Sequence, residues 1–134
     1  MLTKDDIESF LVRLSSTGAN YEEVQPGFWI VRPSAESELS IAVNFSPPVL
    51  LLRVDVMTLP KDEGRTATLT RRLLELNASD LLHGSYGIQD NSIVLTEALE
   101  LSALDYEEFL ATFESMTLAL AGHMRELSSF REGT

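Results

Sequence analysis

Apolar residues near the start of the chain recur at the spacing of one helical face. The residues that follow the i, i+3, i+4, i+7 pattern are Ile7, Phe10, Leu11 and Leu14. Thr3 followed by Asp6 is typical of a capping box, in which two side chains satisfy free backbone N–H groups at the start of a helix. We therefore predict a helix over residues 5–16, which stops before Gly18 because glycine favours the conformation that ends helices.

Four strand-like runs follow this helix, at residues 21–24, 28–32, 39–45 and 49–56. The first two flank Gln25-Pro26-Gly27, a sequence that favours a tight turn. In the third run, large apolar residues alternate strictly with the small or polar residues Ser40, Ala42 and Asn44, and Pro47-Pro48 separates this run from the fourth. These features predict antiparallel strands that bury one face.

The alternation also predicts how the third and fourth runs pair. If Phe45 lies opposite Leu50, the apolar residues of both runs share one face, and Leu39 lies opposite Val56. A shift by one residue would place an arginine in that apolar face. We therefore expect a connection of four residues, 46–49, between these strands.

Two more helices are predicted in the second half of the chain. Leucines on one stripe indicate a helix over residues 66–77, and a longer apolar stripe indicates another over residues 104–128. Ser102 with Asp105 is a capping signal for the last helix. The long stripe is interpreted as a face that packs on the core, with a helix–helix dimer seam as the alternative.

A β-hairpin is predicted between these two helices. Asp90-Asn91 tolerates positive φ, which suits a turn of two residues. That turn pairs Ile88 with Ile93 on one apolar face.

Composition narrows the class of protein. A chain of 134 residues fits one domain, here residues 1–134, and the absence of cysteine excludes disulfides and thiolate metal sites. The net charge of −11 opposes binding to nucleic acid and to anionic membranes. Three explanations of this acidity are open, namely solubility, attraction to a basic partner and mimicry of nucleic acid.

The N-terminus bears on localisation. It is acidic, whereas a signal peptide begins with basic residues, and we therefore predict a cytoplasmic protein.

The sequence offers few groups for catalysis. His83 and His123 stand apart from each other and from any metal-binding motif, so both are interpreted as surface or boundary residues. The glycines Gly84 and Gly87 lack the Lys-Ser/Thr of a phosphate-binding loop. The acidic pairs are adjacent residues, whose side chains diverge. We therefore predict no catalytic residue, no metal and no cofactor, and leave an enzyme with an unrecognised acidic site as an alternative.

One strand-like run is apolar on both faces. Residues 28–32 place Phe28 on one face and Trp29 on the other, and Leu51 lies among polar neighbours on the face opposite the core. Such a strand is either covered on both sides or offers one side to a partner. We predict that Phe28, Trp29 and Leu51 contribute to partner binding, although the sequence leaves open whether Phe28 or Trp29 faces outward.

The second half of the chain resembles a known group of proteins. A leucine-rich helix that ends in Leu76-Asn77, the paired Gly84 and Gly87, an apolar hairpin and a long final helix are similar to the type III secretion chaperone-like superfamily. That superfamily includes the Tir chaperone (CesT) group and YbjN-like proteins. Leu99-Glu100-Leu101 departs from the pattern, which often has a proline in the middle.

The resemblance implies an α+β fold and a mode of assembly. The expected order is a helix, three antiparallel strands, a helix, a β-hairpin and a long C-terminal helix. The resemblance and the surplus of leucines together imply a homodimer, with an interface formed by Leu69, Leu73, Leu74, Leu81 and Leu82.

The resemblance also implies a function. Secretion chaperones bind an extended segment of an effector protein on apolar patches, so the partner is expected to be another protein, with neither nucleic acid nor membrane involved. The alternative is a YbjN-like regulatory interaction protein that is not linked to secretion.

Overall fold

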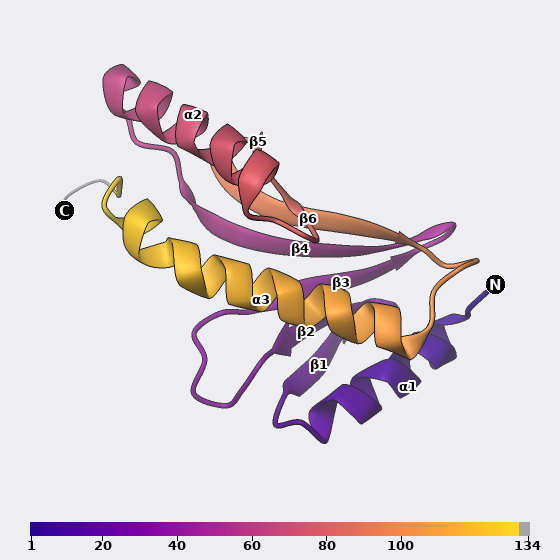
Figure 1. Ribbon diagram of the computed structural model, residues 1–134. Coiled ribbons are helices and arrows are strands. Elements are labelled where there is room, and N and C mark those ends of the chain that lie inside the picture. The colour runs from indigo at the N-terminus through magenta and orange to yellow at the C-terminus, as the bar shows by residue number, and fades with distance from the viewer. Residues whose placement is uncertain (132–134) are drawn as a thin grey trace.

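Three helices cover one face of a six-stranded antiparallel sheet in the computed structural model, which describes residues 1–131 (Figure 1). In chain order the elements are α1 (Lys4–Ser15), β1 (Asn20–Gln25), β2 (Phe28–Arg32), β3 (Ile41–Ser46), β4 (Val49–Thr58), α2 (Glu63–Ser79), β5 (Ser85–Gln89), β6 (Ser92–Glu100) and α3 (Tyr106–Ser128). The predicted α+β class is confirmed. Each of the four strand-like runs before α2 forms a strand, one strand more than the resemblance implied.

The sheet has the strand order β1-β2-β3-β4-β6-β5. The first four strands form a meander, and the hairpin of β5 and β6 then joins it through β6, which pairs with β4. The long helix α3 runs across the sheet, α2 lies over β5 and β6, and α1 lies near β1 (Figure 1). Buried apolar residues of the helices and of one sheet face form a single core. No helix among residues 1–131 has the length and apolar character needed to cross a membrane.

Side chains at the N-terminal caps explain where α1 and α3 begin. The capping box of α1 is present, since the Asp6 carboxylate accepts a hydrogen bond from the Thr3 N–H at 2.8 Å. The predicted cap of α3 at Ser102 is wrong. Asp105 caps this helix instead, because its carboxylate accepts a hydrogen bond from the Glu108 N–H at 2.8 Å.

The predicted register of β3 and β4 is confirmed where the two strands pair. Phe45 lies opposite Leu50. The predicted four-residue connection is wrong, because Ser46 and Val49 themselves pair and leave only Pro47-Pro48 in the turn.

The β5–β6 hairpin forms as predicted. Ile88 lies opposite Ile93, and Asp90 and Asn91 have φ values of 50° and 68°. Both turn residues therefore occupy the left-handed region that a two-residue hairpin turn requires.

Candidate functional site

The sheet face that points away from the helices brings two of the predicted partner-binding residues together. Phe28 of β2 lies opposite Asn44 of β3, and Asn44 lies opposite Leu51 of β4. Because directly opposed residues point to the same face, these three side chains form one row. Leu51 is 38% exposed and Phe28 is partly buried. The two predicted residues therefore lie one strand apart on an accessible face.

Trp29 corrects the sequence prediction. Its side chain is fully buried, since β2 turns it to the opposite face from Phe28 and into the core. Of the two residues between which the sequence could not choose, Phe28 is the one that faces outward. We define the outer-face patch as the partly or fully exposed apolar residues around this row, namely Phe28, Ile30, Ala42, Leu51 and Ala98.

A pocket adjoins the outer-face patch where β3 stops before β4 does. The β3–β4 ladder ends at Ala42 and Arg53, whereas β4 continues to pair with β6 as far as Thr58. A cavity of about 500 Å³ lies beside this part of β4. We call it the β4 gap. Its lining comprises Ile30, Glu38, Leu39, Ser40, Ala42, Arg53, Val54, Asp55, Val56, Leu120, Met124, Ser128 and Arg131.

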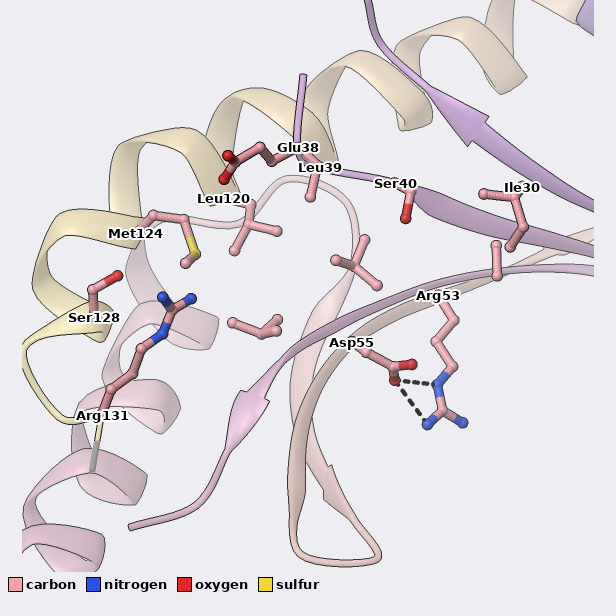
Figure 2. Close-up of a pocket in the computed structure, with 13 residues that line it drawn as sticks. Ile30, Glu38, Leu39, Ser40, Arg53, Asp55, Leu120, Met124, Ser128 and Arg131 are labelled. Carbon is pink, nitrogen blue, oxygen red and sulfur yellow. Dashed lines mark hydrogen bonds and ion pairs between the residues drawn. The ribbon is translucent and has the colours of Figure 1, made fainter. Parts of the chain in front are cut away.

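Apolar and charged side chains both line the β4 gap. Leu39, Leu120 and Met124 lie close together on one side, and Arg53 and Asp55 lie on the other (Figure 2). The Arg53 guanidinium contacts the Asp55 carboxylate at 2.9 Å and donates a hydrogen bond to the Gln89 side chain at 2.6 Å. These contacts offset the charge of Arg53. The guanidinium of Arg131 lies beside Met124, so charged groups are present on both sides of the gap (Figure 2).

A local hydrogen-bond pair explains why β3 is shorter than predicted. The Leu39 N–H donates to the Ser37 hydroxyl at 3.1 Å, and that hydroxyl donates to the Leu39 carbonyl at 3.4 Å. Serine side chains that bond nearby backbone groups in this way compete with strand pairing. The predicted pairing of Leu39 with Val56 is therefore wrong, since β3 begins at Ile41.

A second apolar surface lies on α2 and β5. Leu74 is 69% exposed and Ile88 is 52% exposed, and a shallow hollow of about 240 Å³ lies between their elements. The loop that joins α2 to β5 carries Leu82, which is 89% exposed. The other predicted interface residues are less accessible. Leu69 and Leu73 are buried in the core, although Leu73 also lines the hollow, and Leu81 is partly buried against the core.

A buried polar network, which the sequence did not predict, joins α2, β5 and α3. The Tyr86 hydroxyl lies 2.7 Å from His123 Nδ1, and His123 Nε2 lies 3.2 Å from the Asp80 carboxylate. The Asn77 side chain accepts a hydrogen bond from the Tyr86 N–H at 2.7 Å and donates one to the Tyr86 carbonyl at 3.1 Å. His123, which was predicted to be a surface or boundary residue, is therefore nearly buried. Its place between Leu120 and Leu127 on the apolar stripe of α3 was the available signal.

The network links α2, β5 and α3 and shifts the pKa of two of its groups. Burial raises the pKa of Tyr86 above its ordinary value, so the phenol stays neutral. Hydrogen bonds from Ser79 and then from His123 lower the pKa of Asp80, so this carboxylate is ionised at neutral pH. Within residues 1–131, no group of three or more acidic, histidine or cysteine side chains could hold a metal ion.

Replacing Tyr86 by phenylalanine should destabilise the fold. The change leaves His123 Nδ1 without its partner in a nearly buried position, which should lower the free energy of unfolding by about 1–3 kcal/mol. Urea unfolding measures this loss. The control is Tyr106→Phe, which removes a hydroxyl that has no hydrogen-bond partner among residues 1–131. Equal losses in both variants would contradict a stabilising role for the network.

These features define a class of protein. An antiparallel sheet with helices on one face is the α+β fold that a chain of a type III secretion complex also has. The chain belongs to the CesT_Tir_1 family, whose model matches residues 2–132. The resemblance seen in the sequence is therefore confirmed.

Solved structures support the same fold. A chain of the heterodimeric ExoU–SpcU complex from the type III secretion system of Pseudomonas aeruginosa is 14% identical, with a TM-score of 0.67, over 96% of this chain and 99% of its own. YbjN from E. coli is also 14% identical, with a TM-score of 0.66, over 93% of each chain. A chain of the HopA1–SchA chaperone–effector complex is 10% identical, with a TM-score of 0.62, over 91% of this chain and 92% of its own. No curated protein matches the chain in sequence.

Proposed function

We propose that the protein is a non-enzymatic chaperone, similar to those of type III secretion, that binds a segment of another protein in the cytoplasm. The observation that carries this proposal is the outer-face patch, on which Phe28 and Leu51 lie in one row on a sheet face that the helices leave open. Exposed apolar side chains of this kind are typical of protein interaction sites.

The charge of the chain suggests the kind of partner. A net charge of −11 attracts basic segments and repels phosphate backbones and anionic lipid. We propose a partner segment that combines apolar residues, which contact the patch, with basic residues around them. Charge of this kind mainly raises the rate of association, while the apolar contacts supply affinity.

We also propose that the protein is a homodimer. The surface formed by Leu74, Leu82 and Ile88 lies on α2, β5 and the loop between them, apart from the outer-face patch, so a second copy and a partner segment need not compete.

A regulatory interaction protein is the second candidate. The similarity to YbjN equals the similarity to the ExoU–SpcU chain in identity and nearly equals it in TM-score. The partner distinguishes the two candidates. A secretion chaperone should bind a protein that the host exports, and a regulator should bind one that stays in the cell.

The proposed function predicts that Leu51→Asp weakens partner binding at least tenfold. A charge in the patch prevents the burial of an apolar side chain that is worth roughly 1.5–3 kcal/mol. The partner is first captured in the native host with a photoreactive amino acid at position 51. Its affinity is then measured for the unmodified protein and for Leu51→Asp. A photoreactive group at Val12, exposed on α1, is the control. If Leu51→Asp binds the captured partner as tightly as the unmodified protein, the outer-face patch is not the binding site.

A further inference from the structure

The edge of β4 that faces the β4 gap has main-chain groups without a strand partner. In a two-residue hairpin the closing pair, here Ser46 and Val49, exchanges two hydrogen bonds, and every second pair along the ladder does the same. In β4 this series runs through Leu51 and Arg53 to Asp55. Because the pairing with β3 ends at Arg53, no strand within residues 1–131 pairs with Asp55 on this side. Its N–H and C=O therefore point into the gap.

The segment before β3 has the residues that would continue this pairing. The register of β3 and β4, extended by two positions beyond its last pair, places Ser40 opposite Asp55, where the two residues would exchange two hydrogen bonds. The next position places Leu39 opposite Val56, with both side chains on the core face. Ser40 and Leu39 already line the β4 gap. The sequence therefore fits a strand that is two residues longer than β3.

One hydroxyl group keeps this segment out of the strand. The Ser37 N–H donates a hydrogen bond to the Ser34 carbonyl at 3.2 Å, which fixes a turn. The Ser37 hydroxyl accepts a hydrogen bond from the Leu39 N–H at 3.1 Å and donates one to the Leu39 carbonyl at 3.4 Å. These local bonds hold residues 37–39 in an arrangement that competes with an extended strand.

The two arrangements of this segment exchange one set of contacts for another. Releasing Leu39 from the Ser37 hydroxyl breaks two hydrogen bonds. Pairing Ser40 with Asp55 forms two, and such exchanges nearly cancel in net free energy. The Leu39 side chain is partly buried beside α3 in the structure and would stay against the core in the paired arrangement (Figure 2). No large difference in free energy therefore separates the two.

We infer that residues 37–40 form a strap that opens and closes the β4 gap. The structure shows the open position, in which the Ser37 hydroxyl holds Leu39. In the closed position Ser40 pairs with Asp55, β3 becomes two residues longer, and Leu39 fills the apolar part of the gap. Two states of similar free energy are both populated, and a change that favours one of them shifts the population toward it.

The strap is a means of regulating the outer-face patch, which it adjoins. Ile30 and Ala42 belong both to the patch and to the lining of the gap. Closure adds Ser40 to the outer face beside Asp55, so the border of the patch changes from an opening to a continuous sheet. The inference itself does not depend on the proposed function, because the strap and the gap both belong to this chain.

The variant Ser37→Ala tests the strap, because it removes only the hydroxyl that holds the open position. By NMR, the amide hydrogen of Asp55 should exchange at least tenfold more slowly than in the unmodified protein. A nuclear Overhauser effect should also appear between the α-hydrogens of Leu39 and Val56, which lie close together in an opposed pair of this kind. The matched control is Ser34→Ala, since the Ser34 hydroxyl has no hydrogen-bond partner among residues 1–131. This control should change exchange at Asp55 less than twofold.

A disulfide detects the closed position in a protein that keeps Ser37. The chain contains no cysteine, so Ser40→Cys combined with Asp55→Cys supplies a single pair. Opposed residues of a hydrogen-bonded antiparallel pair have Cα atoms about 5.5 Å apart, which a disulfide spans. Under mild oxidation this pair should cross-link within one chain at least tenfold faster than Ala35→Cys combined with Asp55→Cys, as measured by mass spectrometry.

Three results would overturn the inference. The first is a folded Ser37→Ala protein in which the Asp55 amide exchanges as fast as in the unmodified protein. The second is equal slowing in Ser37→Ala and Ser34→Ala, which would show a general effect of the loop. The third, which decides the matter if Ser37→Ala does not fold, is a cysteine pair at positions 40 and 55 that cross-links no faster than the control pair.

Discussion

Replacing Leu52 by aspartate is expected to abolish the folded state. Leu52 is fully buried at the centre of the sheet, opposite Val43 on one side and Glu97 on the other. The change buries a carboxylate without a partner and sets it directly across from a second carboxylate. The cost of several kcal/mol compares with a total stability of about 5–15 kcal/mol for a domain of ordinary stability. Circular dichroism during heating should therefore show no cooperative transition.

The adjacent residue provides the control. Leu51 lies on the opposite face of β4, between Asn44 and Ala98, and is open to solvent. Leu51→Asp should therefore change the free energy of unfolding by less than about 1 kcal/mol, as surface substitutions usually do. A loss of stability in Leu51→Asp as large as that in Leu52→Asp would mean that both faces of β4 are covered, and the outer-face patch would not exist.

The sequence predicted those parts of the fold that depend on local chemistry and on strict alternation. The pairing of Phe45 with Leu50 could be predicted because a half-buried strand has only one register that keeps its apolar residues together. The turn at Asp90-Asn91 could be predicted because few residues tolerate positive φ. In both cases the determining residues are close together in the chain.

Features that depend on distant residues could not be predicted in the same way. Which face of β2 the helices would cover, and therefore the burial of Trp29, depends on the packing of elements far along the chain. The network of Tyr86 and His123 joins residues 37 positions apart that share no motif. The β4 gap depends on a hydroxyl contact between Ser37 and Leu39 that competes with a strand predicted by alternation.

The leucines of α2 show another way in which the sequence prediction failed. Their number suggested surplus apolar surface, and Leu69, Leu73 and Leu74 were assigned to an interface. The helical period divides them, however, since Leu69, Leu73 and Leu76 lie on one stripe and enter the core. Leu74 is displaced from this stripe by one position, which is about 100° around the helix, and is exposed. The interface proposal therefore depends on Leu74 and Leu82, and on Ile88, which was not among the predicted residues.

We expect the purified protein to be a homodimer at tens of micromolar and Leu74→Asp to be a monomer. In a two-fold dimer the same surface of each subunit meets its copy, so one substitution introduces two carboxylates into the interface. Losing two buried leucines at roughly 1.5–3 kcal/mol each should raise the dissociation constant at least ~100-fold.

Sedimentation equilibrium measures the masses of the unmodified protein and of Leu74→Asp. Leu118→Asp, which places the same charge on an equally exposed leucine of α3, should remain a dimer. Circular dichroism should show that both variants are folded, because each substituted side chain lies on the solvent face of its helix. A monomer in the unmodified protein at these concentrations, or a dimer that survives Leu74→Asp, would show that this surface does not bind a second copy.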